Sequence, residues 1–349
     1  MTEGGDAEAK EWLQGRCVFE WLYFASPNSY VEGRSVYSVR EKLGALLGRK
    51  EKEDIDIAIP APDSGRSAVV GYAEALTERR FIENLLGKTV TFDDAKIKEL
   101  LDAIAWYKDG FYKSPYTTRT FQVGDKEERY ATIDVKLAPN KEVVKNRSIA
   151  YIDDSIVRLS TNTRAVARLR RKGAKEVHVR ITTPPILSFC PLGIDMRTKQ
   201  ELVARRKLEE VMSSMSDISV ARLPYSIVDK ILIAGSVEAA ADELGIDADH
   251  LRSAMEEANE RMVESVCDEM GADSLVYTTI DELVETINLV PARPGAPEKL
   301  PYEKLCTGCL GGRYPLERRI VERLLKSDGD GGRAWEQQAS TRKADTPKK

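Results

Sequence analysis

The segment from Ser148 to Thr161 constrains the fold of this chain more than any other. Its first part, Ile149 to Ile152, is an apolar run of buried-strand length, and it ends in two adjacent carboxylates, Asp153 and Asp154. Short hydroxyl residues follow, and residues 162–172 are predicted to form a helix that opens with good capping residues. The pattern therefore predicts a strand, a compact loop and a helix.

The residue types in this segment suit a phosphorylated sugar. Backbone N–H groups at the start of a helix favour a phosphate, and carboxylates at the end of a strand favour hydroxyl groups or a divalent cation. A ribose 5-phosphate that carries a metal-bound diphosphate offers all of these groups. The residues alone leave a second interpretation open, a capped turn with solvated acids.

A second strand, turn and helix occur earlier in the chain. Residues 55–60 are predicted to form a strand that leads into Ala61-Pro-Asp-Ser-Gly65, and residues 66–76 are predicted to form a helix. Gly65 can adopt unusual backbone angles, and the amides of such a turn can face a ligand. With a further strand at residues 175–182, these units predict a parallel sheet.

Charge and cysteine content narrow the class of protein. The net charge of -4 gives no electrostatic footprint for nucleic acid, and no apolar run is long enough to cross a bilayer, so a cytoplasmic protein is expected. Five cysteines without a signal peptide argue against a disulfide framework. Cys306-Thr-Gly-Cys309 is the one pair at chelating spacing in the sequence, while Cys17 in a predicted apolar strand and Cys267 in a predicted helix read as packed thiols.

The Ser148–Thr161 segment resembles the phosphoribosyl pyrophosphate (PRPP) signature of type I phosphoribosyltransferases, in the form found in glutamine PRPP amidotransferases. The resemblance covers most of residues 16–76, 111–212 and 271–326. It implies an α/β fold of the type I phosphoribosyltransferase class, with a parallel sheet flanked by helices, helical insertions and a C-terminal cluster-binding segment. The expected organisation is a flexible arm (1–16), one domain (17–326) with insertions at about 77–109 and 216–270, and a disordered tail (327–349). Within the insertions, residues 93–107 and 248–270 are predicted to form helices. Residues 111–121 are predicted to form a loop, and residues 129–137 a strand.

The resemblance also implies roles for individual residues. Asp153 and Asp154 would hold the ribose hydroxyls and, with the diphosphate, a Mg²⁺ ion. The 5-phosphate would lie in the loop formed by Ser155, Ile156, Val157, Arg158, Leu159, Ser160 and Thr161, and the leaving pyrophosphate would be held by Asp63, Ser64 and Gly65. Lys113 and Tyr116 align with the family's flexible catalytic loop. Leu159 departs from the family's glycine, and a left-handed backbone there would cost about 1–2 kcal/mol.

Four of the five cysteines align with the positions that ligate a [4Fe–4S] cluster in one branch of the family: Cys17, Cys190, Cys306 and Cys309. Four thiolates are the ligand set that such a cluster requires. The resemblance therefore implies a cluster, or zinc in its place, that ties the N-terminal strand to the C-terminal segment.

The implied activity is a glycosyltransferase reaction, the formation of 5-phosphoribosylamine from PRPP and ammonia in the first step of purine synthesis. The family's glutaminase half begins with a nucleophilic cysteine, and no cysteine precedes Cys17. We therefore expect ammonia from solution or from a separate glutaminase subunit, and a homo-oligomer as in the family. Two alternatives stay open: a non-catalytic iron–sulfur paralogue that binds PRPP or nucleotide and regulates or scaffolds a partner, and a phosphoribosyltransferase with a different acceptor. His178, in mid-strand, reads as a packed histidine and not as a catalyst.

Overall fold

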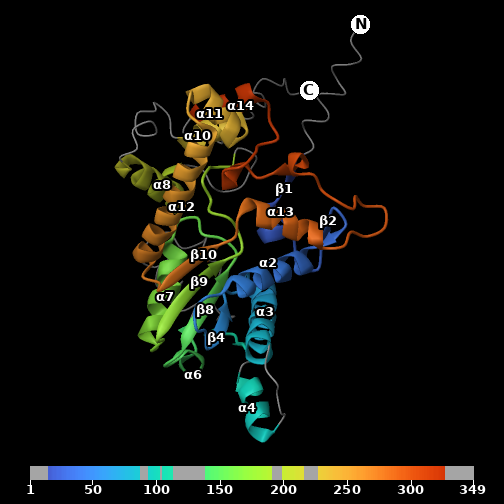
Figure 1. Ribbon diagram of the computed structural model, residues 1–349, viewed down its shortest axis with the longest axis vertical. Coiled ribbons are helices and arrows are strands. Elements are labelled where there is room, and N and C mark those ends of the chain that lie inside the picture. Colours follow the sequence, from blue (N-terminus) through green and yellow to red (C-terminus); the bar gives the residue numbers. More distant parts are fainter. Residues whose placement is uncertain are drawn as a thin grey trace, which may run out of the picture.

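The computed structural model describes residues 15–86, 93–102, 104–112, 138–190, 199–215 and 227–326. Its centre is a sheet of five parallel strands, which confirms the predicted parallel α/β architecture (Figure 1). In spatial order the strands are β10 (Ser274–Tyr277), β9 (Glu176–Ile181), β8 (Ser148–Asp153), β4 (Ile57–Pro60) and β5 (Trp106–Tyr107).

Strand β8 is in the middle of the sheet and is buried along its whole length. Successive side chains of a strand point to opposite faces. Accordingly, Ile149 and Tyr151 join a core cluster with α7 (Ser160–Arg171), whereas Ala150 and Ile152 join a second cluster with α2 (Val36–Lys50) and α3 (Arg66–Leu85). Because helices cover both faces of the sheet, every side chain of β8 is buried, and its sequence does not alternate between apolar and polar residues.

Helices α2 and α3 pack closely because glycines lie at their contact. A side chain at Gly44 would overlap the carbonyl oxygen of Ala68, and one at Gly71 would overlap that of Glu41. This close approach holds α3 rigidly behind the β4 end of the sheet, and α3 begins directly after the turn that contains Gly65.

A helical lobe lies at the other end of the molecule (Figure 1). It contains α8 (Val203–Ser214), α10 (Ile227–Ala234), α11 (Val237–Leu244), α12 (Ala248–Met270) and α14 (Arg318–Lys326). The helices expected between residues 216 and 270 are confirmed for the described part, and α12 has the predicted bounds. Within the lobe, the buried Asp229 binds Lys199 at 2.7 Å and Arg205 at 3.1 Å.

The chain around Cys17 differs from the predicted apolar strand. Only β1 (Arg16–Cys17) is extended, and it pairs in parallel with β11 (Leu305–Cys306). A π-helical turn, Glu20–Phe24, follows, because the carbonyl of Trp21 and that of Ala25 accept hydrogen bonds from Arg40 of α2. A long-range partner therefore decides the local conformation.

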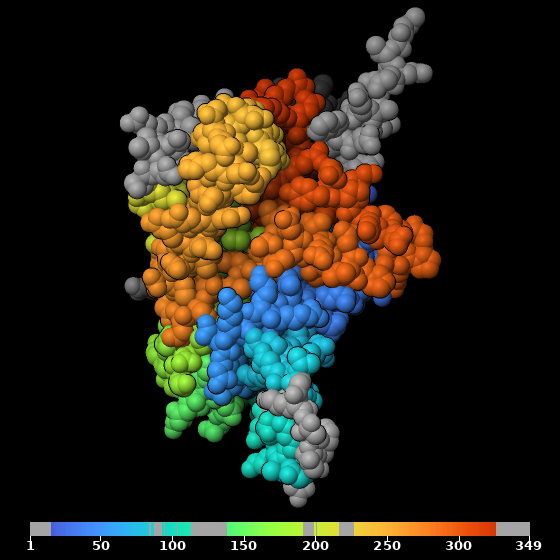
Figure 2. Space-filling view, viewed as in Figure 1, coloured from blue at the N-terminus to red at the C-terminus, as the bar shows by residue number. Residues whose placement is uncertain are grey.

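The predicted helix over residues 93–107 is also wrong at its end. Helix α4 (Asp94–Asp102) stops early, and Trp106–Tyr107 form β5 against Ile57 and Ala58. The two aromatic residues favour a strand. The backbone N–H of Ala105, just before β5, donates to the Thr77 hydroxyl at 2.8 Å. In Figure 2, α4 projects from the body of the molecule below α3.

The remaining elements are short. They are β2 (Tyr30–Val31), β3 (Arg34–Ser35), β6 (Phe111–Tyr112), β7 (Ala138–Pro139), α6 (Lys141–Val144), a 3-10 turn at Lys199–Glu201, α13 (Ile280–Leu289), and 3-10 turns at Tyr302–Lys304 and Gly308–Leu310. The segment predicted as a loop from residue 111 begins with β6, and its continuation lies outside the described residues, as do the strand predicted at 129–137, most of the N-terminal arm and the tail at 327–349. None of the described helices is both long and apolar enough to span a membrane.

Candidate active site

The two predicted acids lie at the carboxyl end of the central strand. Asp153 is the last residue of β8 and Asp154 follows it, and their side chains are only 6% and 7% exposed. Their carbonyl groups are fixed to the end of β9, because Thr182 N–H donates to Asp153 at 3.1 Å and Thr183 N–H donates to Asp154 at 3.0 Å. The acid pair is therefore rigid before any ligand binds.

The Asp153 carboxylate joins three segments that are distant in the sequence. Its Oδ1 accepts hydrogen bonds from the Ser64 hydroxyl at 3.0 Å and from the Asp154 N–H at 2.9 Å, and its Oδ2 accepts one from the Asn162 amide at 2.9 Å. Ser64 belongs to the predicted pyrophosphate turn and Asn162 to the first turn of α7. The structure thus brings the predicted pyrophosphate turn, the acid pair and the predicted phosphate loop together.

The two acids are not equivalent. Both oxygens of Asp153 accept hydrogen bonds inside the protein, whereas Asp154 Oδ2 accepts one from the Ser155 hydroxyl at 2.7 Å and the Asp154 carboxyl also hydrogen-bonds that of Asp153. Among the described residues, Asp154 therefore has the greater capacity to accept hydrogen bonds from a ligand. Sequence reasoning treated the pair as alike.

Burial and then the charge of the neighbouring Asp154 raise the pKa of Asp153 well above the ordinary range. The folded protein therefore binds more protons than the unfolded chain at pH values above the ordinary carboxyl pKa of about 3.9. The stability contributed by neutral Asp153 is present at low pH and is lost as the pH rises through the folded pKa.

We expect urea unfolding from pH 5 to pH 8 to show that the ligand-free protein loses stability relative to the Asp153→Asn variant. A stability difference that does not change with pH would contradict this assignment.

The turn before α3 needs its glycine for close approach. Gly65 has an ordinary φ of −79°, so the expected unusual backbone angle is wrong. A side chain at this position would overlap the carbonyl oxygen of Ile152, which accepts a hydrogen bond from the Ala61 N–H at 2.7 Å. The turn also contains a cis peptide bond between Pro62 and Asp63, and the Asp63 carboxylate contacts Arg66 at 3.4 Å.

The predicted phosphate loop ends in a strained residue. Leu159 has a left-handed backbone, with φ 59° and ψ −31°, and directly precedes α7, which begins two residues earlier than predicted. Its side chain is buried in the same core cluster as Tyr151 and Val166. The burial of the leucine side chain offsets the backbone strain.

Leu159→Gly should separate these two effects. Relief of the left-handed backbone gains about 1–2 kcal/mol, and loss of a buried leucine costs about 2–5 kcal/mol, so the free energy of unfolding should fall by about 1–3 kcal/mol. Leu159→Ala loses the side chain without relieving the backbone, and urea unfolding should show it to be the less stable variant. Equal stabilities would show that the backbone at residue 159 is not strained.

Two residues that sequence reasoning missed support the acids. Asn162 donates to Asp153, and Arg40, buried on α2, lies near enough for the Asp154 charge to raise its pKa, although burial is the larger effect and lowers that pKa. Asn162 was predicted only as part of a helix, and Arg40 is distant in the sequence. No local motif distinguishes either residue from an ordinary helix residue.

The structure places none of the other residues discussed from the sequence, Lys113, Tyr116, His178 and Cys267, at the acid pair within its described ranges. Lys113 and Tyr116 lie outside the described residues. His178 is buried in β9, where its Nδ1 is 2.9 Å from the Ser274 hydroxyl, and it is distant along the strand from the acid pair. Cys267 lies in α12, where its thiol contacts the Ala272 carbonyl at 3.4 Å and burial raises its pKa to about 11.

The four predicted cysteine ligands come from three segments that meet. Cys17 and Cys306 are register partners in the β1–β11 pair, and the Cys309 carbonyl accepts hydrogen bonds from Leu187 and Ser188, shortly before Cys190. Burial, and to a smaller extent the charges of Cys17 and Cys190, raise the pKa of Cys306 to about 12. Burial and the charges of the other three thiols raise the pKa of Cys309 well above its ordinary value.

The thiols are thus close enough to interact electrostatically and are poorly solvated. Within the described ranges, no three His, Cys, Asp or Glu side chains are grouped tightly enough to hold a single metal ion. A four-iron cluster binds each thiolate at a separate iron, so its ligands surround a larger volume. The donor set and its burial fit such a group.

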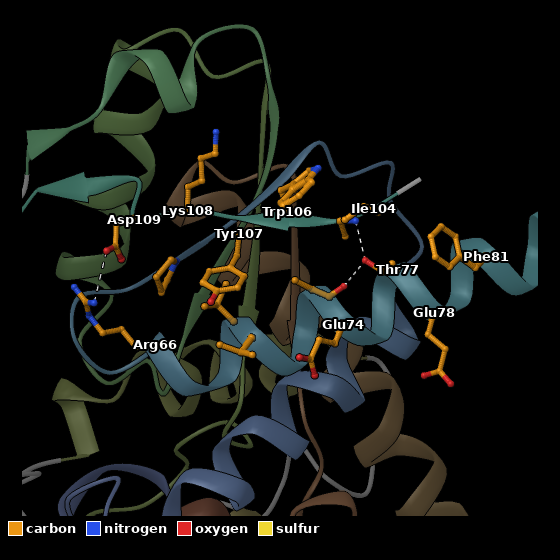
Figure 3. A pocket seen from close by; sticks show the side chains of 15 residues that line it. Arg66, Glu74, Thr77, Glu78, Phe81, Ile104, Trp106, Tyr107, Lys108 and Asp109 are labelled. Carbon is orange, nitrogen blue, oxygen red and sulfur yellow. Dashed lines mark hydrogen bonds and ion pairs between the residues drawn. The ribbon is translucent and has the colours of Figure 1, made fainter. Parts of the chain in front are cut away.

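A large cavity lies between α3 and β5 and does not include the acid pair. It has a volume of about 1090 Å³, and the aromatic side chains of Tyr107 and Phe81 line it (Figure 3). The ion pair between Arg66 and Asp109, 3.6 Å long, lies at the end nearest the 61–65 turn. Because neither Asp153 nor Asp154 lines this cavity, it is a separate feature of the surface.

Sequence comparison and structure comparison both find PRPP amidotransferases as proteins similar to this chain. No family model matches the chain. The amidophosphoribosyltransferase of Methanocaldococcus jannaschii is 38% identical over 194 residues, which is 56% of this chain and 36% of that protein. The amidophosphoribosyltransferase of Methanothermobacter thermautotrophicus is 30% identical over 309 residues, which is 88% of this chain and 46% of that protein.

Two solved structures share the fold. Glutamine PRPP amidotransferase from B. subtilis, in complex with ADP and GMP, superposes with a TM-score of 0.56 and 27% identity over 87% of this chain and 48% of that one. A structure described as the allosteric regulatory enzyme of purine biosynthesis gives a TM-score of 0.53 and 28% identity. The expected phosphoribosyltransferase fold is thereby confirmed. The chain spans less than half the length of these relatives, and over that part of their length it is a homologue of the amidophosphoribosyltransferases.

Proposed function

We propose that this chain forms 5-phosphoribosylamine from PRPP and ammonia. The observation that carries the proposal is the meeting of three segments at the Asp153 carboxylate: the 61–65 turn, the end of β8 and the start of α7. One substrate with a diphosphate, a ribose ring and a 5-phosphate would contact all three segments at once. The named relatives support the reaction class, since they are amidophosphoribosyltransferases.

Each segment would hold one part of PRPP. The loop from Ser155 to Thr161 and the N-terminus of α7 would bind the 5-phosphate, because free N–H groups and the helix dipole favour an anion there. The turn from Asp63 to Gly65 would bind the diphosphate, and Asp154 would accept hydrogen bonds from the ribose hydroxyls. Asp153 would position Ser64 and Asn162. Lys113 and Tyr116 would close over the bound substrate, as the family resemblance implies.

The reaction needs no protein nucleophile. The bond from C1 to the pyrophosphate oxygen breaks, and pyrophosphate leaves with the electron pair. The ammonia lone pair then forms the C1–N bond, and the surplus proton passes to solvent. A ribose that loses pyrophosphate carries positive charge at C1 and the ring oxygen, and a fixed carboxylate such as Asp154 stabilises that charge. Mg²⁺ would arrive on the diphosphate of PRPP and would neutralise the leaving group.

The cysteine set would hold a [4Fe–4S] cluster. Cys17 and Cys306 on paired strands, with Cys190 and Cys309 beside them, would attach the N-terminal segment to the C-terminal segment. The group would stabilise the fold and would take no part in the transfer. Iron and sulfide analysis of anaerobically purified protein tests this, and protein that contains neither iron nor sulfide would refute the cluster.

The nitrogen source would be ammonia from solution or from a separate glutaminase subunit. We also propose a cytoplasmic homo-oligomer, on the basis of the family resemblance. The tests are pull-down with tagged protein for the subunit, and light scattering for the oligomer.

Pyrophosphate release from PRPP tests the function. We expect release that requires both ammonium and Mg²⁺, with no release above background in the absence of a nitrogen donor. Purified protein that binds PRPP but gives no turnover with ammonium would refute the proposal and would favour the non-catalytic paralogue. Release of pyrophosphate with another nucleophile only would favour a different acceptor.

A further inference from the structure

A buried tyrosine connects the segments that hold three of the four clustered cysteines. The Tyr314 ring packs so tightly on Gly308, between Cys306 and Cys309, that a side chain at Gly308 would overlap the ring. The Tyr314 hydroxyl donates to the carbonyl of Phe189, the residue before Cys190, at 2.5 Å. One side chain therefore touches the chelating loop and fixes the backbone next to the third cysteine.

A buried serine lies at the same place. Ser188 is fully buried, and its hydroxyl makes no hydrogen bond of good geometry within the part of the chain that the structure describes, although it lies beside the Tyr314 phenol. Its backbone N–H donates to the Cys309 carbonyl at 3.0 Å. An unused buried hydroxyl is costly unless it gains a partner, and the sulfur atoms of the cysteine set are the acceptors that a bound cluster would bring.

The effect of the cysteine thiols on the Tyr314 phenol agrees with its place beside them. Burial, in the first place, and then the charges of Cys309, Cys190 and Cys306 raise the pKa of the Tyr314 phenol well above its ordinary value. The phenol therefore lies within electrostatic range of all three thiols. Nothing in the proposed transfer reaction uses Tyr314 or Ser188.

We propose that Tyr314 is a positioning residue for the cluster, that it sets Cys190 against Cys306 and Cys309, and that Ser188 donates a hydrogen bond to the cluster sulfur. The proposal rests on the cluster assigned above to these cysteines. Groups that orient metal ligands commonly change metal affinity by 10- to 100-fold, and hydrogen bonds to sulfur shift the reduction potential of iron–sulfur clusters.

The experiment compares four proteins reconstituted anaerobically with iron and sulfide: wild type, Tyr314→Phe, Ser188→Ala and Tyr302→Phe. Tyr302 is the control, because its hydroxyl is also on the cysteine loop but contacts the Thr307 hydroxyl at 3.2 Å and not the Cys190 segment. The readouts are iron and sulfide content, the decay of the cluster's visible absorption in air, the midpoint potential and the melting temperature.

We expect Tyr314→Phe to load a cluster and then lose it about tenfold faster than wild type, with only a small fall in the melting temperature of the loaded protein, because one buried carbonyl loses its donor. Ser188→Ala, which leaves the aromatic ring in place, should lower the midpoint potential, and Tyr302→Phe should match wild type in both readouts. Decay of Tyr314→Phe at the wild-type rate would overturn the positioning role, and an unchanged potential in Ser188→Ala would overturn the sulfur hydrogen bond. Wild-type protein that takes up no iron would instead refute the cluster itself, and with it both roles.

Discussion

Replacing Asp154 by asparagine should lower kcat/KM for PRPP by about 10²- to 10³-fold, the typical effect of removing one fixed electrostatic group from a transition state. Asp154 follows the rigid end of β8, its backbone is fixed to β9, and its carboxylate is the less occupied of the two acids. Asparagine keeps the size of the side chain but loses the charge that would stabilise positive C1. The measurement is initial-rate release of pyrophosphate with ammonium as the nitrogen donor.

Two further variants test whether the loss of activity is specific to the charge of Asp154. Asp268→Asn changes an exposed acid on α12 and should leave turnover unchanged. Asp153→Asn should impair PRPP binding, because an amide NH2 in place of Oδ2 can no longer accept the hydrogen bond from Asn162. If Asp154→Asn retained wild-type kcat/KM, the acid pair would not be part of the reacting site.

Replacing Glu51 by glutamine should lower the free energy of unfolding by about 3–5 kcal/mol, because it leaves a buried arginine without its counter-charge. Glu51 is 2% exposed and Arg180 is 1% exposed, and the guanidinium donates to the two carboxylate oxygens at 2.6 and 2.7 Å. The Tyr72 hydroxyl also donates to Glu51. The pair joins the end of α2 to β9, and Tyr72 adds a contact from α3, so its loss affects the face of the sheet that α2 and α3 cover.

The Glu51–Arg180 pair also makes the free energy of unfolding depend on pH, and the sign of this dependence follows from the pKa of Glu51. Burial alone would raise the pKa of Glu51, but hydrogen bonds and charge from Arg180 lower that pKa to about 2. The stability that Glu51 contributes is therefore present above the ordinary glutamate pKa of about 4.3 and is lost as the pH falls towards 2. Urea unfolding from pH 7 to pH 3 should show that the difference in unfolding free energy between wild type and Glu51→Gln shrinks as the pH falls.

The control for the Glu51→Gln variant is Arg252→Gln, which removes an exposed pair with Glu238 and should leave the unfolding midpoint unchanged. A wild-type midpoint for Glu51→Gln would contradict the role of the pair.

Local patterns accounted for the parts of the fold whose cause is local. The β8 strand, the acid pair and the following helix were predictable because an apolar run, charged turn residues and capping residues follow each other directly. Helix α12 was predictable for the same reason, since Asp247 caps its start and Gly271 ends it in a left-handed conformation.

The parts that were not predictable depend on partners distant in the sequence. The turn after Cys17 is set by Arg40, and strand β5 exists because β4 offers an open edge to Trp106 and Tyr107. In the site, the contact between Ser64 and Asp153 spans 89 residues. The family resemblance placed both residues at one substrate, but neither the resemblance nor the local pattern gave the unequal use of Asp153 and Asp154.

The most direct test is a crystal structure of the protein with Mg²⁺ and PRPP. We expect the 5-phosphate at the N-terminus of α7, the diphosphate on the turn from Asp63 to Gly65, and the ribose hydroxyls within hydrogen-bond distance of Asp154. PRPP bound elsewhere, for example in the cavity between α3 and β5, with the carboxylate of Asp154 turned away from it, would refute the proposed function.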